Sequence, residues 1–318
     1  MRLATFEDGT ADGSLAVISA DGERYLPAGK CLLAAIEDWA ATAPMLCALE
    51  QELANGQGQA LAALSLLAPL PRAWQWLDAS AFTSHGDLMQ IAFGLDPVES
   101  DQPLMYQGIS DRFLAPGADV PLPDEADGID FEGEFAIVTD FVPMGTSAAN
   151  ALAHIKLVLQ LNDWSLRVPG AAEMRTGFGW VQAKPACSVA PFAVTPEELG
   201  SDWRDGRVCL ELAVDFRGAR FGAARGDEMA FGFHELIAHA ARTRHLVAGT
   251  IIGSGTVSNR NYREIGSSCI AERRAIEIVD AGAPATEFMR FGEMIRMEGR
   301  NMDGRAPFGA IEQRVVRA

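Results

Sequence analysis

Apolar and acidic residues alternate along residues 129–138, IDFEGEFAIV. The apolar positions recur with the period of two that places alternate side chains on opposite faces of a β-strand: Ile129, Phe131, Phe135 and Ile137. The opposite face then carries three acids, Asp130, Glu132 and Glu134, before it becomes apolar at Ala136 and Val138. The pattern predicts a strand that places three carboxylates side by side.

A second alternating stretch, IKLVLQLN at residues 155–162, predicts another strand with a buried face. An isoleucine or leucine stands at every second position, and Asp163 directly follows Asn162, the last residue of the stretch. This strand therefore delivers a fourth acid at its end.

The remaining pattern predicts a strand-rich α+β chain. Short strands with Asp-Gly turns are expected in residues 1–30, helices at 31–56, 148–154 and 231–246, and two strands joined by a turn at Asp303-Gly304 near the C-terminus. Pro69 and Pro71 interrupt any regular element, so we expect a domain boundary there. The predicted domains are a small N-terminal unit, 1–71, and a larger unit, 72–318.

Composition narrows the classes of function. The 318 residues carry 43 acids and 26 lysines and arginines, a net charge of −17. Proteins that bind nucleic acids or anionic membranes need a basic surface, so we expect neither partner. The longest apolar stretch, residues 61–70, is too short to cross a membrane.

The cysteines indicate a reducing compartment. They are odd in number, widely spaced and without a CxxC pair: Cys31, Cys47, Cys187, Cys209 and Cys269. Neither a zinc ribbon nor a disulfide framework is indicated. The first residues, MRLATFEDGT, contain no apolar segment typical of a secretory signal, so we expect a cytoplasmic protein.

Three acids on one strand face allow two arrangements. Side chains two residues apart lie about 7 Å from each other, and like charges at that distance repel. Either the face is fully solvated, or a hard divalent cation such as Mg²⁺, Mn²⁺ or Ca²⁺ binds between the carboxylates. The apolar residues that continue the same face, Ala136 and Val138, argue against solvation.

Four motifs in order resemble those of the fumarylacetoacetate hydrolase family. They are the ExE of residues 132–134, NDWSLR at 162–167, the segment around QAKP at 182–185 and GSGT at 253–256. The resemblance covers roughly residues 72–318. It implies a mixed β-roll or β-sandwich catalytic domain behind the small α+β N-terminal domain, and it implies that members are homodimers.

The resemblance also implies roles for individual residues. Glu132, Glu134 and Asp163 match the metal-binding carboxylates of the family, and Lys184 matches a lysine that faces the oxyanion of the substrate. The substrate-binding positions correspond to Tyr106 in MYQG and Thr256 in GSGT. His85 lies near the family's water-activating histidine, and Glu272 lies near the partner of that histidine.

Two departures from the family pattern stand out. The fourth acid expected just before Phe82 is replaced by Ala81, and VPGAAEM at 168–174 stands where the family has a glutamine and a tyrosine for the substrate. Taken alone, the candidate residues also allow ordinary roles: His85 and Lys184 in solvated loops, Tyr106 in the core, and Glu272 paired with a neighbouring arginine.

We therefore expect a metal-dependent hydrolase that cleaves a carbon–carbon bond in a β-diketo acid resembling fumarylacetoacetate or an acylpyruvate. In this mechanism His85 activates water, and the metal and Lys184 stabilise the enolate. The first alternative is a lyase or isomerase of 2-oxo acids, which needs no water-activating pair. The second is a binding module without catalysis. A His–Glu pair facing the metal site distinguishes the hydrolase from the others.

Overall fold

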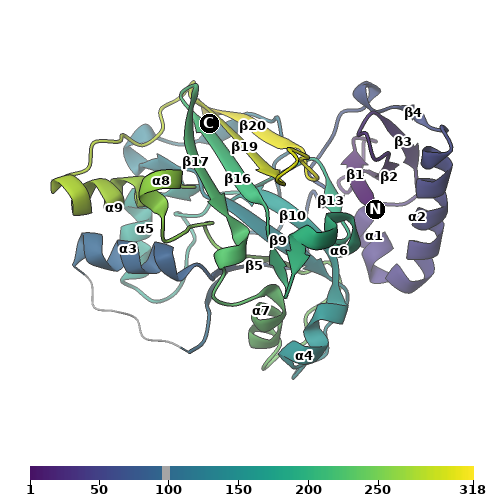
Figure 1. The fold of residues 1–318 in the computed structure, drawn as a ribbon, viewed down its shortest axis with the longest axis horizontal. Helices are drawn as coiled ribbons and strands as arrows, with labels where there is room; N and C mark the ends of the chain where they lie inside the picture. Colours follow the sequence, from purple (N-terminus) through teal and green to yellow (C-terminus); the bar gives the residue numbers. More distant parts are fainter. Residues whose placement is uncertain (95–100) are drawn as a thin grey trace.

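The computed structural model describes residues 1–94 and 101–318. The larger of its two main sheets has 11 strands, in the order β4-β3-β2-β1-β13-β10-β9-β18-β5-β6 with β12 also paired to β10 (Figure 1). The bounds are β1 Arg2–Phe6, β2 Ser14–Ile18, β3 Arg24–Pro27, β4 Gln59–Ala60, β5 Trp76–Ser80, β6 Leu104–Gly108, β9 Gly133–Thr139, β10 Ile155–Asn162, β12 Ser188–Val189, β13 Ala193–Val194 and β18 Ile251–Gly253. This sheet runs from the N-terminal strands into the rest of the chain without a break.

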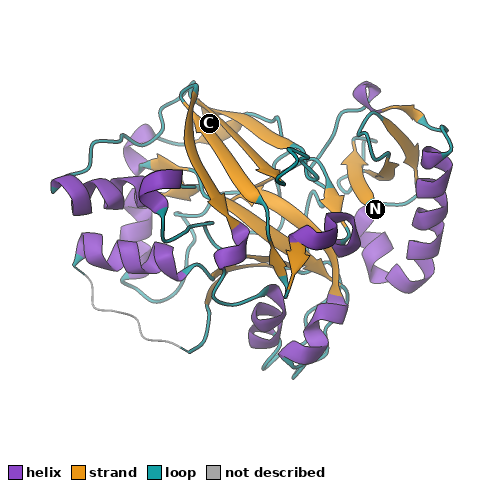
Figure 2. Cartoon of the chain, in the orientation of Figure 1, coloured by secondary structure: helices purple, strands orange, loops and turns teal. Residues whose placement is uncertain are grey.

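A five-stranded sheet, in the order β17-β16-β19-β20-β7, packs against the larger sheet (Figure 2). Its strands are β7 Val120–Leu122, β16 Glu211–Phe216, β17 Ala219–Arg225, β19 Met294–Arg300 and β20 Ala310–Arg317. Two short ladders complete the described pairings: β8 Ile129–Asp130 with β11 Ser165–Leu166, and β14 Trp203–Arg204 with β15 Arg207–Val208.

The helices lie around these sheets (Figure 2). They are α1 Leu32–Glu37, α2 Trp39–Ala54, α3 Thr83–Phe93, α4 Ala148–Ala151, α5 Arg167–Met174, α6 Pro196–Leu199, α7 Phe233–Ala240, α8 Tyr262–Ile265 and α9 Ile270–Ala281. Among the described residues, no helix combines the length and the hydropathy that a membrane span requires.

Strand β9 takes part in two hydrophobic cores, as its alternating sequence predicts. Phe135 and Ile137 lie between the two sheets, whereas Ala136 and Val138 point the other way, toward a core shared with the N-terminal helices. The residues before β9 do not continue the strand, because the pairing of β9 with β10 stops at Gly133 and β8 pairs with β11. The predicted strand 129–138 is thus two strands.

The other predicted elements have mixed outcomes. The strand-rich α+β class, the strand at 155–162 and the two C-terminal strands are confirmed. The helix predicted at 31–56 is divided into α1 and α2, and that at 231–246 is limited to 233–240. Periodicity does not predict α3, α5, α6, α8 or α9. The loop position expected for His85 is therefore wrong, since His85 lies in the first turn of α3.

One buried side chain connects the two sheets. Gln160 of β10 is fully buried, its Nε2 donates to the carbonyl of Met297 at 3.1 Å, and its Oε1 accepts from the amide of Gly299 at 2.6 Å. Both partners belong to β19. Buried amides need such partners, because an unpaired polar group loses its solvation without compensation.

Replacing Gln160 by leucine should therefore destabilise the fold by about 1–3 kcal/mol, because two backbone groups of β19 lose their partner. Urea unfolding measures this change in the free energy of unfolding. The matched control is Gln51→Leu on the exposed face of α2, which should change it by no more than about 0.5 kcal/mol. Equal effects of the two variants would contradict the assigned role.

Candidate active site

Three carboxylates meet at the centre of the larger sheet. Asp78 of β5, Glu134 of β9 and Asp163 directly after β10 have carboxylate oxygens that all lie within 4.8 Å of one another. Each of the three side chains is buried, with at most 4% of its surface exposed. The three strand acids Asp130, Glu132 and Glu134 are likewise buried, with at most 6% exposed, so the solvated-face alternative is wrong.

The local backbone leaves room for these carboxylates. Gly253 of β18 lies between β5 and β9, and a Cβ atom at this position would stand 2.6 Å from Asp78 Oδ1 and 2.9 Å from Glu134 Oε2. The amide of Gly255 donates to both carboxylates at 3.2 Å. Any side chain at 253 would thus displace the acids that the strands bring together.

Full ionisation of the cluster is unfavourable without a cation. Burial, together with the charge of Asp163, raises the pKa of Asp78 to about 8. Burial and the charge of Asp78 raise the pKa of Glu134 well above its ordinary value. Glu134 Oε1 is buried and has no hydrogen-bond partner. Buried oxygen ligands, an unpaired acceptor and space kept by a glycine fit a hard divalent cation.

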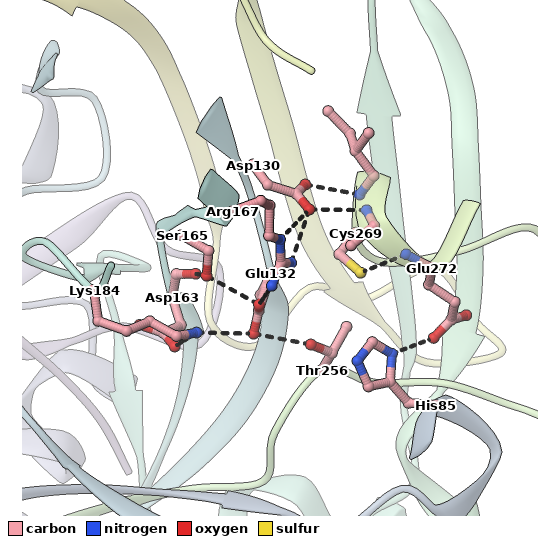
Figure 3. Close-up of polar contacts among 12 residues, drawn as sticks. His85, Asp130, Glu132, Asp163, Ser165, Arg167, Lys184, Thr256, Cys269 and Glu272 are labelled. Carbon is pink, nitrogen blue, oxygen red and sulfur yellow. Dashed lines mark hydrogen bonds and ion pairs between the residues drawn. The ribbon is translucent and has the colours of Figure 1, made fainter. Parts of the chain in front are cut away.

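Glu132 lies beside this trio and binds different partners. Its Oε2 accepts from Thr256 at 3.0 Å and contacts the ammonium of Lys184 at 3.2 Å (Figure 3). Its Oε1 contacts Arg167 Nη1 at 2.7 Å and accepts from Ser165 at 2.9 Å. Burial raises the pKa of Glu132, but the neighbouring Lys184 and Arg167 outweigh burial, so the pKa is lowered.

Lys184 connects Glu132 to the trio. Its ammonium lies 2.5 Å from Asp163 Oδ2, and its side chain is largely buried. Burial lowers the pKa of Lys184, but Asp163 and Glu132 more than reverse that effect, so the pKa is raised and the lysine stays charged. The loop position expected for this residue is correct, but the loop is not solvated.

Asp130, the first of the three strand acids, has a structural role. Its carboxylate accepts from Arg167 Nε at 2.8 Å and from the amides of Ile270 at 2.7 Å and Ala271 at 2.8 Å. These amides open helix α9, where unpaired N–H groups favour a negative charge. Asp130 therefore holds α9 against the strands (Figure 3).

Tyr106 and Cys187 complete the surroundings of Asp163. The hydroxyl of Tyr106 donates to Asp163 Oδ2 at 2.6 Å, and the thiol of Cys187 lies 2.9 Å from Oδ1. Burial and the charge of Asp163 raise the pKa of both groups well above their ordinary values, so both remain protonated donors. Tyr106 thus contacts the cluster rather than filling the core.

His85 and Glu272 form the predicted pair. Nδ1 of His85 lies 2.6 Å from Oε2 of Glu272, which is fully buried in the first turn of α9 (Figure 3). The hydroxyl of Ser84, next to His85, donates to Ser258 at 2.9 Å and holds α3 against the segment that carries Thr256. Glu272 therefore pairs with the histidine and not with Arg273 or Arg274.

The structure also shows an acid that the sequence analysis missed. The segment before His85 supplies its carboxylate from Asp78 and not from position 81. Ala81 is buried there, and its amide donates to the carbonyl of Ser254. The signal was a single acid within the short apolar run WLDA of residues 76–79. One acid in such a run gives no indication of its partners.

Comparisons with known proteins identify a family over most of the chain. The family model described as the fumarylacetoacetate (FAA) hydrolase C-terminal domain matches residues 75–316, and that of fumarylacetoacetase N-terminal domain 2 matches residues 1–72. A 158-residue segment is 26% identical to a 2,4-didehydro-3-deoxy-L-rhamnonate hydrolase of Sphingomonas sp. (strain SKA58), over 49% of this chain and 53% of that protein. The human mitochondrial oxaloacetate tautomerase FAHD2A is 23% identical over 49% of this chain and 48% of its own. The match spans about half the length of these curated relatives.

Solved structures resemble the whole chain. Maleylpyruvate hydrolase from Sphingobium sp. SYK-6, in complex with manganese (II) ion and pyruvate, has a TM-score of 0.68 and 18% identity, covering 100% of both chains. A 5-carboxymethyl-2-hydroxymuconate delta-isomerase from Mycobacterium smegmatis has a TM-score of 0.64 and 19% identity, covering 100% of this chain and 99% of that one. At these identities the likeness establishes the fold.

The raised pKa of Asp78 has a consequence for metal-free protein. A carboxyl whose pKa is about 8 in the folded state and near 4 in the unfolded state binds more protons when folded across that interval. Stability should therefore fall as pH rises from about 5 to 8, and saturating Mn²⁺ should oppose the fall. The midpoint of thermal unfolding, measured across this pH range with EDTA or with Mn²⁺, reports the change. In EDTA the midpoint of an Asp78→Asn variant should depend less on pH than that of the wild type. The same dependence on pH in both proteins would contradict the prediction.

Asp78 should also contribute to metal binding. Asp78→Asn should weaken Mn²⁺ binding by at least about tenfold in calorimetric titrations of EDTA-treated protein, because one of three hard ligands loses its charge. Asp87→Asn, at an exposed position of α3, is the control and should bind Mn²⁺ as the wild type does. Glu132→Gln in the same assay decides whether Glu132 adds a fourth carboxylate. Unchanged affinity of Asp78→Asn would exclude Asp78 as a ligand.

Proposed function

Because this chain belongs to the fumarylacetoacetate hydrolase family, we propose that it is a metal-dependent hydrolase that cleaves a carbon–carbon bond of a β-diketo acid. The observation that carries this proposal is the 2.6 Å contact between His85 and Glu272 beside the carboxylates. Substrates of the acylpyruvate or fumarylacetoacetate type have the two carbonyl groups that this chemistry requires.

The cation would be held by Glu134, Asp163 and Asp78, with Glu132 next to them as a further candidate ligand. When bound, such an ion polarises the keto and enol oxygens of the substrate and offsets the charge that develops on them. Mn²⁺ is the first ion to test, because the structurally similar maleylpyruvate hydrolase was solved with manganese. Mg²⁺ and Ca²⁺ suit the same oxygen ligands.

His85 acts as the general base for water. Its Nδ1 is engaged by Glu272, which leaves Nε2 to accept the proton of a water molecule. The carboxylate of Glu272 fixes the orientation of the ring and stabilises the imidazolium that forms. Glu272 is held beside the ring by its fully buried position in the first turn of α9. The hydroxide then attacks the carbonyl carbon of the bond that breaks.

Lys184 and its neighbours stabilise the departing group. The raised pKa of Lys184 keeps its ammonium charged, so the residue supplies electrostatic stabilisation of an enolate rather than acting as a base. The hydroxyls of Tyr106 and Thr256 donate to Asp163 and Glu132, the two carboxylates that Lys184 contacts, and from there they can reorient toward the substrate. The enolate is finally protonated, and the imidazolium of His85 is the adjacent acid.

A second candidate function is a tautomerase or isomerase of 2-oxo acids. Curated relatives named as oxaloacetate tautomerases favour it. Decarboxylases and hydratases belong to the same alternative. These reactions share the metal and the enolate, but they need no activated water. We retain the expected homodimer and the cytoplasmic location as predictions.

His85→Ala should lower kcat for acetylpyruvate hydrolysis by about 10²–10⁴-fold while Mn²⁺ affinity stays unchanged, because only the base is lost. The matched control is His154→Ala, which breaks a similar 2.7 Å contact with Asp140 outside the site and should keep full activity. The keto–enol conversion of oxaloacetate is measured in parallel. If His85→Ala remains within about threefold of the wild type in hydrolysis, the isomerase candidate replaces the hydrolase.

A further inference from the structure

A second polar cavity lies at the far end of the Trp76 indole from the carboxylates. Its volume is about 200 Å³, and its lining includes Trp76, Gln107, Gly108, Ser110, Arg244 and His245. The benzene end of the indole reaches the space beside Gly253, whereas the pyrrole edge with Nε1 packs on Gly108. The ring therefore separates this cavity from the candidate active site.

The lining is basic in an acidic protein. The chain has 43 acids against 26 lysines and arginines, yet among the described residues no acid lines this cavity, whereas Arg244 and His245 do. The guanidinium of Arg244 donates from Nη1 to Gln107 Oε1 at 2.9 Å, which holds it over the cavity. A guanidinium has five N–H groups, so further donors remain for a ligand.

His245 presents a donor of defined orientation. Its Nδ1 accepts from the amide of Met144 at 2.9 Å, and its ring stacks on Phe141 with centroids 5.3 Å apart. Because Nδ1 is the acceptor, Nε2 carries the proton in the neutral ring. These two contacts hold the imidazole in place, and neither of them involves the Nε2–H group.

From these contacts we propose that the cavity binds a small oxyanion, a carboxylate or a phosphate, through Arg244 and His245. An anion supplies acceptors for both donors and complements the charge of the lining. The volume lies below the range of about 300–1,000 Å³ that is typical of sites for larger organic ligands, so the ligand has few heavy atoms. This site is separate from the cation site and from Lys184.

Calorimetric titration of the EDTA-treated full chain with inorganic phosphate and, separately, with acetate tests the proposal at low ionic strength. The tighter of the two probes identifies the class of anion. Arg244→Gln should weaken binding of that probe by about tenfold or more, because a charge-assisted hydrogen bond is lost. Arg242→Gln is the matched control at an exposed position outside the cavity, and it should bind as the wild type does.

Circular dichroism and the thermal midpoint confirm that Arg244→Gln is folded. The proposal is overturned if neither anion binds the wild type, or if Arg244→Gln binds as tightly as Arg242→Gln does. It is equally overturned if light scattering shows that Arg244→Gln dissociates an oligomer, since the basic lining would then belong to a subunit contact.

Discussion

Repulsion among buried carboxylates is the constraint on which this structure depends. Asp78, Glu134 and Asp163 are brought within 4.8 Å by three strands of one sheet, and Glu132 lies beside them. Lys184 compensates only part of this charge, so the remainder requires protons or a cation. Several features serve that requirement. Gly253 leaves space for the carboxylates, the amide of Gly255 donates to two of them, Arg167 pairs with Glu132, and Tyr106 donates to Asp163.

The three acids of the first alternating stretch have separate tasks because the strand is interrupted. Glu134 belongs to β9 and joins the cluster, whereas Asp130 belongs to β8 and binds the start of α9. Glu132 lies in the interruption and contacts Lys184, Thr256 and Arg167. The ten residues 129–138 thereby contribute to the acidic cluster, contact Lys184 and anchor the helix that carries Glu272.

Local periodicity was sufficient to predict the strands at the centre of the fold. Phe135, Ile137 and the alternating leucines of β10 follow the period of two closely, because each strand has a strictly buried face. Helix α3 gave no comparable signal. It contains Gly86, and among its residues of described burial only Leu88 is a buried hydrophobe of ordinary core size.

Asp78 escaped prediction for a different reason. Its neighbours in space come from the parallel pairing of β5 with β18, which joins segments far apart in the chain. No local pattern encodes that pairing. The motifs of the family supplied the remaining site residues, since the proximity of His85 and Glu272 also depends on contacts between distant helices.

The helices α3 and α9 pack on each other through a small hydrophobic cluster of their own, formed by Leu88, Ala275 and Ile276. The carboxylates, in contrast, are fixed by the sheets. The His85–Glu272 pair therefore depends on a packing contact between two helices as well as on the sheets. A substitution in this small cluster would shift the histidine relative to the glutamate while the strands keep the carboxylates in place.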